Sequence, residues 1–597
     1  MSSFFDEASL VMIPSGYKNQ KVYSIKPLDG AGDLAFSRAS SATRVASNGL
    51  IEKVRTNLIL QSQAFNTTWS SSSLSVSSNT TANPLDGAVN ADTITLTGGT
   101  TQKWVAQSLA QNGLYTYSVY AKAGTHNFIQ LMLGSDGGVY ANFNISTGAV
   151  TLSAGCVASV VSAGNGWYRC SIAYSTTIAD LVFVLAVDSG SATRFAASSS
   201  TGTFILFGAQ LETSDIATDY IATTTAAVSV GPVSGLPRLD YLNSTCPRLL
   251  LEPQRTNLQT NSENGTGTNW GNSLRVNVTA NQVASPDGYV NADSIADTAV
   301  NGTHWFETSF SATSGTAYTL SFFAKANTLS QVTIYGFSDN GVFALQQAFF
   351  NVSNGTVVSN TGGGTTNVVN YGNGWYRVSL TLTSGATATG YLGFGLAKNG
   401  SSSYTGDGSS LYMWGIQLEA GAYATSYIPT LGTSVTRVSE SSSSPSIPSL
   451  FGATEGSFFI EMTFDGRNAN GAIPLFLRSS VNGSFNQATY LQFGTSDIVL
   501  NVYSGGTSQA AISGGSFTNG QTLKVAFAYK ANDFVMYVNG VQIGTDTSGA
   551  ISTSLSFVDL GSYLQLQSTF QYDGKISQAL LFKTRLPNES LAELTSL

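Results

Sequence analysis

The chain contains two tandem copies of one long segment, and this duplication constrains its fold more than any other feature. Each copy begins with Arg-Thr-Asn-Leu, at 55–58 and at 255–258, and ends with Gln-Leu-Glu followed by Tyr-Ile. The motifs Asn-Ala-Asp, Ala-Lys-Ala and Gly-Asn-Gly-Trp-Tyr-Arg recur between them in the same order. Shared motifs at variable spacing indicate domain duplication. Duplicated binding modules gain avidity, whereas a catalytic site seldom needs a second copy.

Both copies show the period of two that is typical of β-strands. Residues 115–122 alternate between two faces, and residues 318–325 repeat the alternation. Glycine-rich turns separate such strands at regular intervals, and helical periodicity is nearly absent. The sequence therefore predicts an all-β fold with one β-sandwich or jelly roll per copy, over 55–230 and 255–439.

The remaining segments differ from the two copies. Residues 450–597 alternate as a separate β-sandwich, with a type I′ hairpin turn at Asn539-Gly540 and a closing strand and short helix at the end. The Ser-rich stretch 440–449 is interpreted as a linker, and 231–254 as a connector. Residues 1–54 are too few and too polar to bury a core, so we expect them to be anchored on something larger.

Composition limits the classes of partner. Only 10% of the residues are charged and the net charge is −8, without a run of Lys or Arg, which argues against nucleic acid or an anionic membrane. No stretch approaches the ~18 apolar residues of a membrane span, and Met1–Gly16 lacks the pattern of a signal peptide. Such a surface-type composition fits a protein made in a host cytoplasm and released by lysis, as a virus particle is.

Several motifs resemble those of a widespread family of tailed-bacteriophage structural proteins. They are Gly16-Tyr17-Lys18, Arg38–Val45, Gly49–Glu52, and the connector Pro237–Tyr241 with Leu250–Leu258. The Gly-Asn-Gly-Trp-Tyr-Arg and Gly-x-Gln-Leu-Glu motifs resemble those of carbohydrate-binding-module-like jelly rolls. The unit at 450–597 is similar to concanavalin A-like, laminin-G-type lectin domains.

The resemblance implies a virion surface protein, of the tail fibre, spike, head fibre or capsid decoration type, that binds host-surface glycans. It also implies contact with other virion proteins through the N-terminal segment and, by analogy, a homo-oligomer such as a trimer. In the family, the segment holding Arg38 and Arg44 closely precedes the Pro-Arg-x-Asp-Tyr element. Here the first jelly roll intervenes, so it stays open whether 20–54 pack against the second module.

Trp167 and Trp375 are the candidate sugar-binding residues. If alternation continues from the preceding turn, they lie on the face opposite the core-facing tyrosines, where an aromatic ring can stack on a sugar. Arg169 and Arg377 share that face and can donate to sugar hydroxyls. Core packing and coverage by a neighbouring subunit are the alternatives.

Four recurring carboxylates form the candidate metal set: Asp92, Glu212, Asp293 and Glu419. Related jelly rolls often hold a structural Ca²⁺ through such groups and backbone carbonyls. Solvated acids at strand ends are the alternative reading. No other cofactor is expected.

The sequence argues against an enzyme. It contains only two histidines, His126 and His304, far apart in the chain, and no phosphate-binding glycine loop. A glycosidase with two distant carboxylates is not excluded by sequence, so a polysaccharide depolymerase remains an alternative. We expect a binding and structural role, as a fibre or spike or as a capsid decoration or head fibre.

Overall fold

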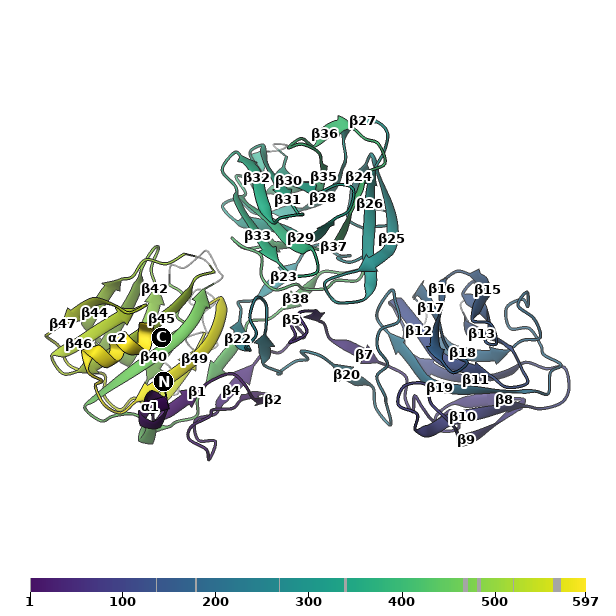
Figure 1. Cartoon of the computed structure of the whole chain (residues 1–597), viewed down its shortest axis with the longest axis horizontal. Coiled ribbons are helices and arrows are strands. Elements are labelled where there is room, and N and C mark those ends of the chain that lie inside the picture. Colours follow the sequence, from purple (N-terminus) through teal and green to yellow (C-terminus); the bar gives the residue numbers. More distant parts are fainter. Residues whose placement is uncertain are drawn as a thin grey trace. The chain divides into compact units, whose positions relative to one another are not determined.

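The computed structural model describes residues 2–135, 137–177, 180–267, 269–337, 341–464, 471–479, 485–518, 520–561 and 571–596. Within these ranges the regular structure is almost entirely β-sheet, which confirms the predicted all-β class (Figure 1). The chain forms two compact units, one of residues 54–231 and one of residues 1–53 with 232–597. No helix in the described part of the chain is long and apolar enough to cross a membrane.

The unit of residues 54–231 is a sandwich of two six-stranded antiparallel sheets. Ile94, Val119 and Leu206 are among the fully buried residues between the sheets. The short strands β7 (Arg55–Asn57) and β20 (Val228–Val230) pair where the chain enters and leaves the unit. One sheet has the order β16 (Val157–Gly164), β17 (Trp167–Thr176), β12 (Gly113–Ala123), β19 (Thr203–Glu212), β10 (Val89–Leu96), β9 (Leu74–Ala82). The other has the order β15 (Ala149–Ala154), β14 (Tyr140–Asn144), β13 (Phe128–Leu133), β18 (Asp180–Ala186), β11 (Lys103–Leu109), β8 (Ser70–Ser72).

The second copy repeats this sandwich strand for strand, so the duplication seen in the sequence is a duplication of fold. Its stem pairs β23 (Arg255–Asn257) with β38 (Val435–Arg437). One sheet has the order β33 (Thr365–Asn370), β34 (Trp375–Thr383), β29 (Ala317–Ala326), β37 (Ser410–Ala420), β26 (Val290–Asp297), β25 (Val276–Ala284). The other has the order β32 (Thr356–Thr361), β31 (Gln346–Asn351), β30 (Gln331–Gly336), β35 (Ala388–Ala397), β28 (Trp305–Ala312), β24 (Asn272–Leu274), and β27 (Asn301–Thr303) pairs with β36 (Ser403–Thr405).

The recurring motifs have structural explanations. Asn165 and Asn373 of the Gly-Asn-Gly turns have φ 51°, a left-handed conformation that asparagine and glycine tolerate best. In the Arg-Thr-Asn-Leu motif, the buried amide of Asn57 donates to the carbonyls of Ala209 and Ile221. Asn257 makes the equivalent pair of bonds in the second copy. These side chains satisfy backbone groups that the sheets leave unpaired.

The C-terminal sandwich recruits strands from both ends of the sequence. The eight-stranded sheet has the order β21 (Arg238–Asp240), β22 (Arg248–Leu251), β49 (Gly574–Phe582), β40 (Glu455–Phe464), β45 (Thr522–Lys530), β46 (Asp533–Val538), β47 (Val541–Asp546), with β1 (Leu10–Met12) also paired to β49. The nine-stranded sheet has the order β2 (Tyr17–Lys18), β3 (Lys21–Val22), β4 (Leu34–Ser37), β39 (Ser441–Ser443), β48 (Phe557–Leu560), β41 (Leu475–Arg478), β42 (Gln487–Phe493), β43 (Ile498–Ser504), β44 (Thr507–Gly514). Beside them lie α1 (Ser2–Glu7), α2 (Asn588–Ser596), a 3₁₀ helix at Pro448–Leu450 and the pair β5 (Arg44–Val45) and β6 (Ile51–Glu52).

This sandwich bears on two sequence interpretations and corrects the second of them. The larger body on which residues 1–54 are anchored is the chain's own C-terminal sandwich, because Leu10 and Phe36 are buried in its core. The Ser-rich stretch predicted as a linker instead begins with β39, a strand between β4 and β48, and Ser442 is 1% exposed. The predicted hairpin turn is confirmed, since Asn539 and Gly540 have φ 48° and 82° between β46 and β47.

The open question about residues 20–54 is also answered. The backbone N–H of Val45 donates to Asp240 of the connector at 2.9 Å. Thr43 donates to the carbonyl oxygen of Tyr427 in the second module at 2.5 Å. The segment therefore packs against both the connector and the second module, and the first jelly roll is an insertion between Lys53 and Pro232.

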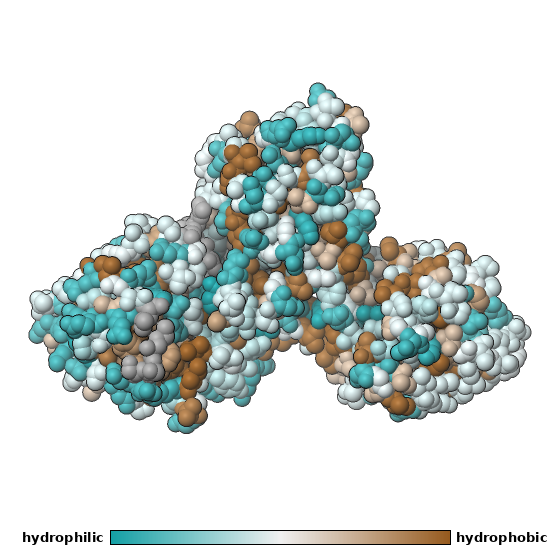
Figure 2. Space-filling view, in the orientation of Figure 1, coloured by the Kyte–Doolittle hydropathy of each residue, from teal (hydrophilic) through white to brown (hydrophobic). Residues whose placement is uncertain are grey.

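The surface matches the low charge of the sequence. Figure 2 shows hydrophilic and near-neutral residues over most of the visible face, with apolar residues in scattered patches. Scattered exposed apolar side chains are normal for a folded protein. In the first module, however, Val157 and Val161 stand on the same face of the edge strand β16 and are 71% and 61% exposed.

Candidate functional site

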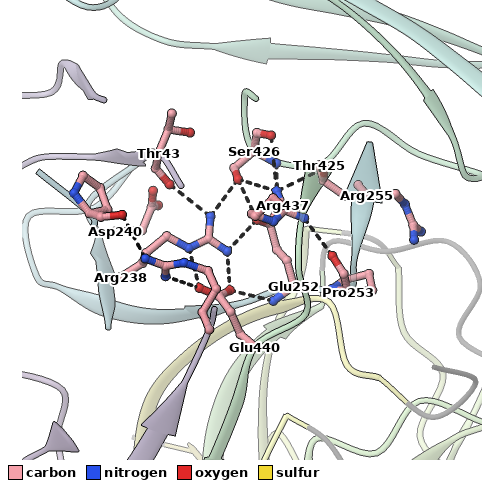
Figure 3. Close-up of polar contacts among 12 residues, drawn as sticks. Thr43, Arg238, Asp240, Glu252, Pro253, Arg255, Thr425, Ser426, Arg437 and Glu440 are labelled. Carbon is pink, nitrogen blue, oxygen red and sulfur yellow. Dashed lines mark hydrogen bonds and ion pairs between the residues drawn. The ribbon is translucent and has the colours of Figure 1, made fainter. Parts of the chain in front are cut away.

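Five buried ionised side chains lie together where the connector meets the second module (Figure 3). We call Arg38, Arg238, Arg437, Glu252 and Glu440 the junction cluster. They come from the N-terminal segment, the connector and the stretch around β38. Each is at most 4% exposed.

Glu440 is the centre of the junction cluster. Its carboxylate accepts hydrogen bonds from Arg38 Nη1 and Arg238 Nε, both at 2.7 Å, and it also pairs with Arg238 Nη2. Glu252 accepts from Arg238 at 2.7 Å and pairs with Arg437 at 2.9 Å. The cluster therefore joins segments that are far apart in sequence.

Charge pairing outweighs burial for Arg238 and Glu252 of the junction cluster. Burial by itself opposes ionisation, but the attraction of Glu440 and Glu252 raises the pKa of Arg238. Burial would likewise raise the pKa of Glu252, but Arg437 and Arg238 lower it strongly. Arg38 is the exception, because burial exceeds the attraction of Glu440 and lowers its pKa. Through these ion pairs the carboxylates of Glu252 and Glu440 contact all three arginines.

A cavity of about 430 Å³ lies beside the junction cluster. This volume is in the range of small-molecule sites, roughly 300–1,000 Å³. One wall is the outer face of β33 and β34 at the edge of the second module, and the other walls come from the connector and the C-terminal sandwich. The cavity is lined by hydroxyl, amide and charged groups of Thr365, Asn367, Ser379, Thr381, Tyr371, Tyr423, Arg248, Asp240, Asp573 and Lys575, among others.

Strand register explains the polar wall. Asn367 is paired with Ser379 and Thr365 with Thr381, so their side chains occupy one face of the two strands. The equivalent positions on β16 and β17 of the first module are Ser159 with Ser171 and Val157 with Ala173. The second module therefore presents a more polar face at the position where the first module is partly apolar.

The charged groups of the cavity are held by local contacts. Asp240 accepts from the N–H groups of Val45 and Leu242, at 2.9 and 3.0 Å, and lies 3.6 Å from Lys575. Burial raises the pKa of Tyr371 and, to a greater extent, of Tyr423, so both phenols remain neutral. The cavity thus combines neutral donors and acceptors with fixed charges, a set that suits a polyhydroxylated ligand.

The predicted sugar-stacking tryptophans are not accessible. Trp167 and Trp375 do lie on the face opposite the main cores, as the alternation predicts, but each is only 1% exposed. Trp375 packs with Phe323, Trp414 and Tyr427, and its indole donates to the carbonyl of Ala284 at 3.1 Å. The expectation of an open outer face is wrong, because the chain's own segments cover these rings.

The paired arginines hold a loop rather than facing solvent. Arg169 donates to the carbonyl of Thr218 at 2.5 Å and to the hydroxyl of Ser118 at 3.0 Å. Arg377 makes the same contacts with Thr425 and Ser321, at 2.5 and 2.9 Å. Arg377 also lines the cavity, whereas Arg169 has no place in it.

The four candidate calcium ligands are not brought together. Asp92 accepts backbone N–H groups of Phe65 and Asn79, and Asp293 accepts those of Gly265 and Asn281. Glu212 and Glu419 each bind the adjacent Gln and Thr218 or Thr425. Across the described ranges, no three His, Cys, Asp or Glu residues are grouped as a metal ion would require. These carboxylates fix the loops and turns at the ends of their strands.

Both histidines and Cys170 occupy buried, structural positions. His126 and His304, in different modules, are 5% and 0% exposed and bond to backbone carbonyls. Burial lowers the pKa of His126 and raises that of the Cys170 thiol. Neither arrangement resembles an activated nucleophile.

Comparisons with known proteins identify one domain. Residues 441–592 match the concanavalin A-like lectin/glucanases superfamily, so the chain carries a concanavalin A-like domain there. A search of curated proteins gives no match.

Several solved structures are similar to part of the chain. The carbohydrate-binding module CBM40 of Ruminococcus gnavus IT-sialidase, bound to α2,3-sialyllactose, is 16% identical over 24% of this chain and 84% of that one, with a TM-score of 0.22. The NanB sialidase of Streptococcus pneumoniae is 19% identical over 25% and 26%, with a TM-score of 0.22. The CBM22 tandem of Paenibacillus barcinonensis Xyn10C is 12% identical over 61% and 96%, with a TM-score of 0.17. At these scores we draw no functional argument from the likeness.

Proposed function

We propose that this protein binds glycans without turning them over, as a structural component of a bacteriophage particle surface. The observation that carries the binding role is the polar cavity beside the concanavalin A-like domain. Sugar hydroxyls both donate and accept hydrogen bonds, and the wall at Thr365, Asn367, Ser379 and Thr381 offers groups of the same kind. The fold alone does not establish binding, because such sandwiches serve many functions.

The proposed ligand site differs from the one that the tryptophans suggested. Asn367 lies exposed on the cavity wall in the edge strand β33, and its Oδ1 accepts a hydrogen bond from the N–H of Val368 at 3.0 Å. Replacing it by alanine removes donors and acceptors with little effect on the sheet. Loss of one or two hydrogen bonds should weaken glycan binding about tenfold, which corresponds to roughly 1.4 kcal/mol.

The test is a glycan array probed with the full chain, followed by calorimetry on the best ligand. Asn367→Ala should weaken binding, and Ser159→Ala, at the equivalent position of the first module, should leave it unchanged. Equal glycan binding by the wild type and the Asn367 variant would show that the glycan site lies outside the cavity.

The proposed particle location is supported by the spaced phage-like motifs and by the low fraction of charged residues. Labelling the chain on purified particles by electron microscopy tests the location and separates a tail fibre or spike from a capsid decoration or head fibre. Incubating the chain with host polysaccharide tests turnover. Released oligosaccharide would show that the protein is a depolymerase and not a binding protein without turnover.

A further inference from the structure

Lys53 occupies an unusual position, with its amine between two carboxylates. Its Nζ lies 2.7 Å from Asp287 Oδ2 and 2.8 and 2.7 Å from the two oxygens of Glu263. The Lys53 and Glu263 side chains are 15% and 13% exposed, and the Asp287 side chain is 1% exposed. Lys53 comes from the N-terminal segment, whereas both acids belong to the second module.

The surroundings of this group are largely apolar and aromatic. Val45, Ile51, Trp414 and Tyr427 form a buried cluster, and Lys53 Nζ lies 5.4 Å from the centre of the Trp414 ring. In the resting pair, burial disfavours the ammonium, but Asp287 and Glu263 raise the pKa of Lys53. Proton transfer along the short ammonium–carboxylate bond would leave two neutral groups, whose burial costs less than the burial of unpaired charges.

The two carboxylates are held differently. Asp287 Oδ1 accepts hydrogen bonds from Ser285 Oγ at 2.6 Å and from the Tyr289 N–H at 3.0 Å. Two fixed donors on one oxygen are the arrangement that stabilises the oxyanion of an acyl-transfer intermediate. Glu263 contacts the amine and accepts from the Tyr427 hydroxyl at 2.9 Å. Asn291 Nδ2 lies 3.2 Å from Asp287 Oδ2 and 3.3 Å from Glu263 Oε2, so it positions both acids.

We propose that Lys53 and Asp287 form an intramolecular isopeptide bond, with Glu263 as the proton shuttle. Because Oδ2 is bonded directly to Cγ, the amine lies close to the carbon that it would attack.

The proposed reaction needs no further reactant. A proton passes from Nζ to Asp287 Oδ2, which gives a neutral amine and a carboxylic acid. The amine attacks Cγ, and the negative charge develops on Oδ1 between its two donors. Glu263 takes a second proton from Nζ and passes it to the Oδ2 hydroxyl. The C–O bond breaks and water leaves, so the amide forms and Glu263 returns to its ionised state.

The first module supplies an internal comparison. Gln63 stands where the second module has Glu263, and Asn90 donates to it at 3.3 Å as Asn291 does to Glu263. Asp86, the counterpart of Asp287, accepts instead from Asn83 at 2.5 Å and from the Ala88 N–H at 2.9 Å. The shuttle carboxylate is therefore present only in the module that receives Lys53.

The bond would join the two sides of the insertion point. Lys53 immediately precedes the unit of residues 54–231, and Asp287 lies beyond its end. If the first jelly roll were pulled, the covalent bond would bear the force in place of the hydrogen bonds of the connector.

Mass spectrometry of the purified full chain tests this inference. The intact mass should be lower than the sequence mass by one water, and trypsin should release residues 45–55 linked to residues 276–325. The variants K53R and E263Q should each have the mass that their own sequence predicts, with folding checked by circular dichroism. An unmodified wild-type mass with both peptides linear overturns the proposal, even if the variants fail to fold. A link from Lys53 to Glu263 overturns the assignment of Asp287.

Discussion

Neutralising Glu440 should open the junction between the N-terminal segment, the connector and the second module. The substitution E440Q keeps the shape of the side chain but removes its charge, which leaves three buried arginines facing Glu252 alone. Glu440 accepts hydrogen bonds from Arg38 and Arg238 and from the Glu252 N–H at 3.1 Å. Removing one partner of a buried ion pair costs about 3–5 kcal/mol.

Hydrogen exchange measured by mass spectrometry is the assay, because it reports local opening in a chain of several domains. Amides of residues 34–45 and 238–252 should exchange at least about 100-fold faster in E440Q, since each 1.4 kcal/mol is roughly a tenfold change. E455Q, which breaks the more exposed pair with Lys530, is the matched control and should leave these amides unchanged. Rates within about threefold of wild type in E440Q would refute the view that the junction cluster holds these segments together.

Two further perturbations follow from the fold. Burial raises the pKa of Asp293 to about 6 despite its two backbone donors, so the folded state binds more protons than the unfolded state between about pH 4 and 6. The free energy of unfolding should fall by up to about 3 kcal/mol as pH rises through that window. In D293N the free energy of unfolding should not fall over this window. Urea unfolding of both proteins at pH 4, 5, 6 and 7 measures it, and the same pH dependence of the free energy of unfolding in both would contradict the raised pKa of Asp293. Deleting residues 54–231 and joining Lys53 to Pro232 through a short Gly-Ser linker should leave the remaining unit folded, because Pro232 is held by Ala42 and Arg38 on the far side of the deletion. Absence of any cooperative thermal unfolding transition in the deletion variant would show that the remaining unit needs the insertion for folding.

The sequence predicted the elements with strong local signals. Alternation located the strands around Tyr117 and Leu320, and the Gly-Asn-Gly and Asn-Gly turns were placed correctly because their residues tolerate positive φ. It did not predict that β1, β2, β3 and β4 join the C-terminal sandwich. Strands of two to four residues carry little periodicity, and their partners lie hundreds of residues away.

The site residues were harder to predict for a related reason. Alternation assigned Trp375 to the correct face, but nothing local to it shows that Val45 and Ile51 cover that face. Glu440 begins a run of serines that is typical of linkers, and only its partners Arg38 and Arg238 explain its burial. Comparing the two copies would have flagged Glu263 against Gln63 and Asn367 against Ser159, because these are substitutions within a shared framework.

The paired stems of the two modules bear on how this gene arose. Each module begins and ends in adjacent antiparallel strands, Arg55 opposite Val230 in one and Arg255 opposite Arg437 in the other. Paired neighbours across such a ladder lie only about 4.5–5.5 Å apart. A DNA segment that encodes one module can therefore be acquired, lost or exchanged by recombination at the Arg-Thr-Asn-Leu codons with little displacement of the flanking chain. If modules are exchanged in this way, variation among related genes should have its breakpoints at these stems.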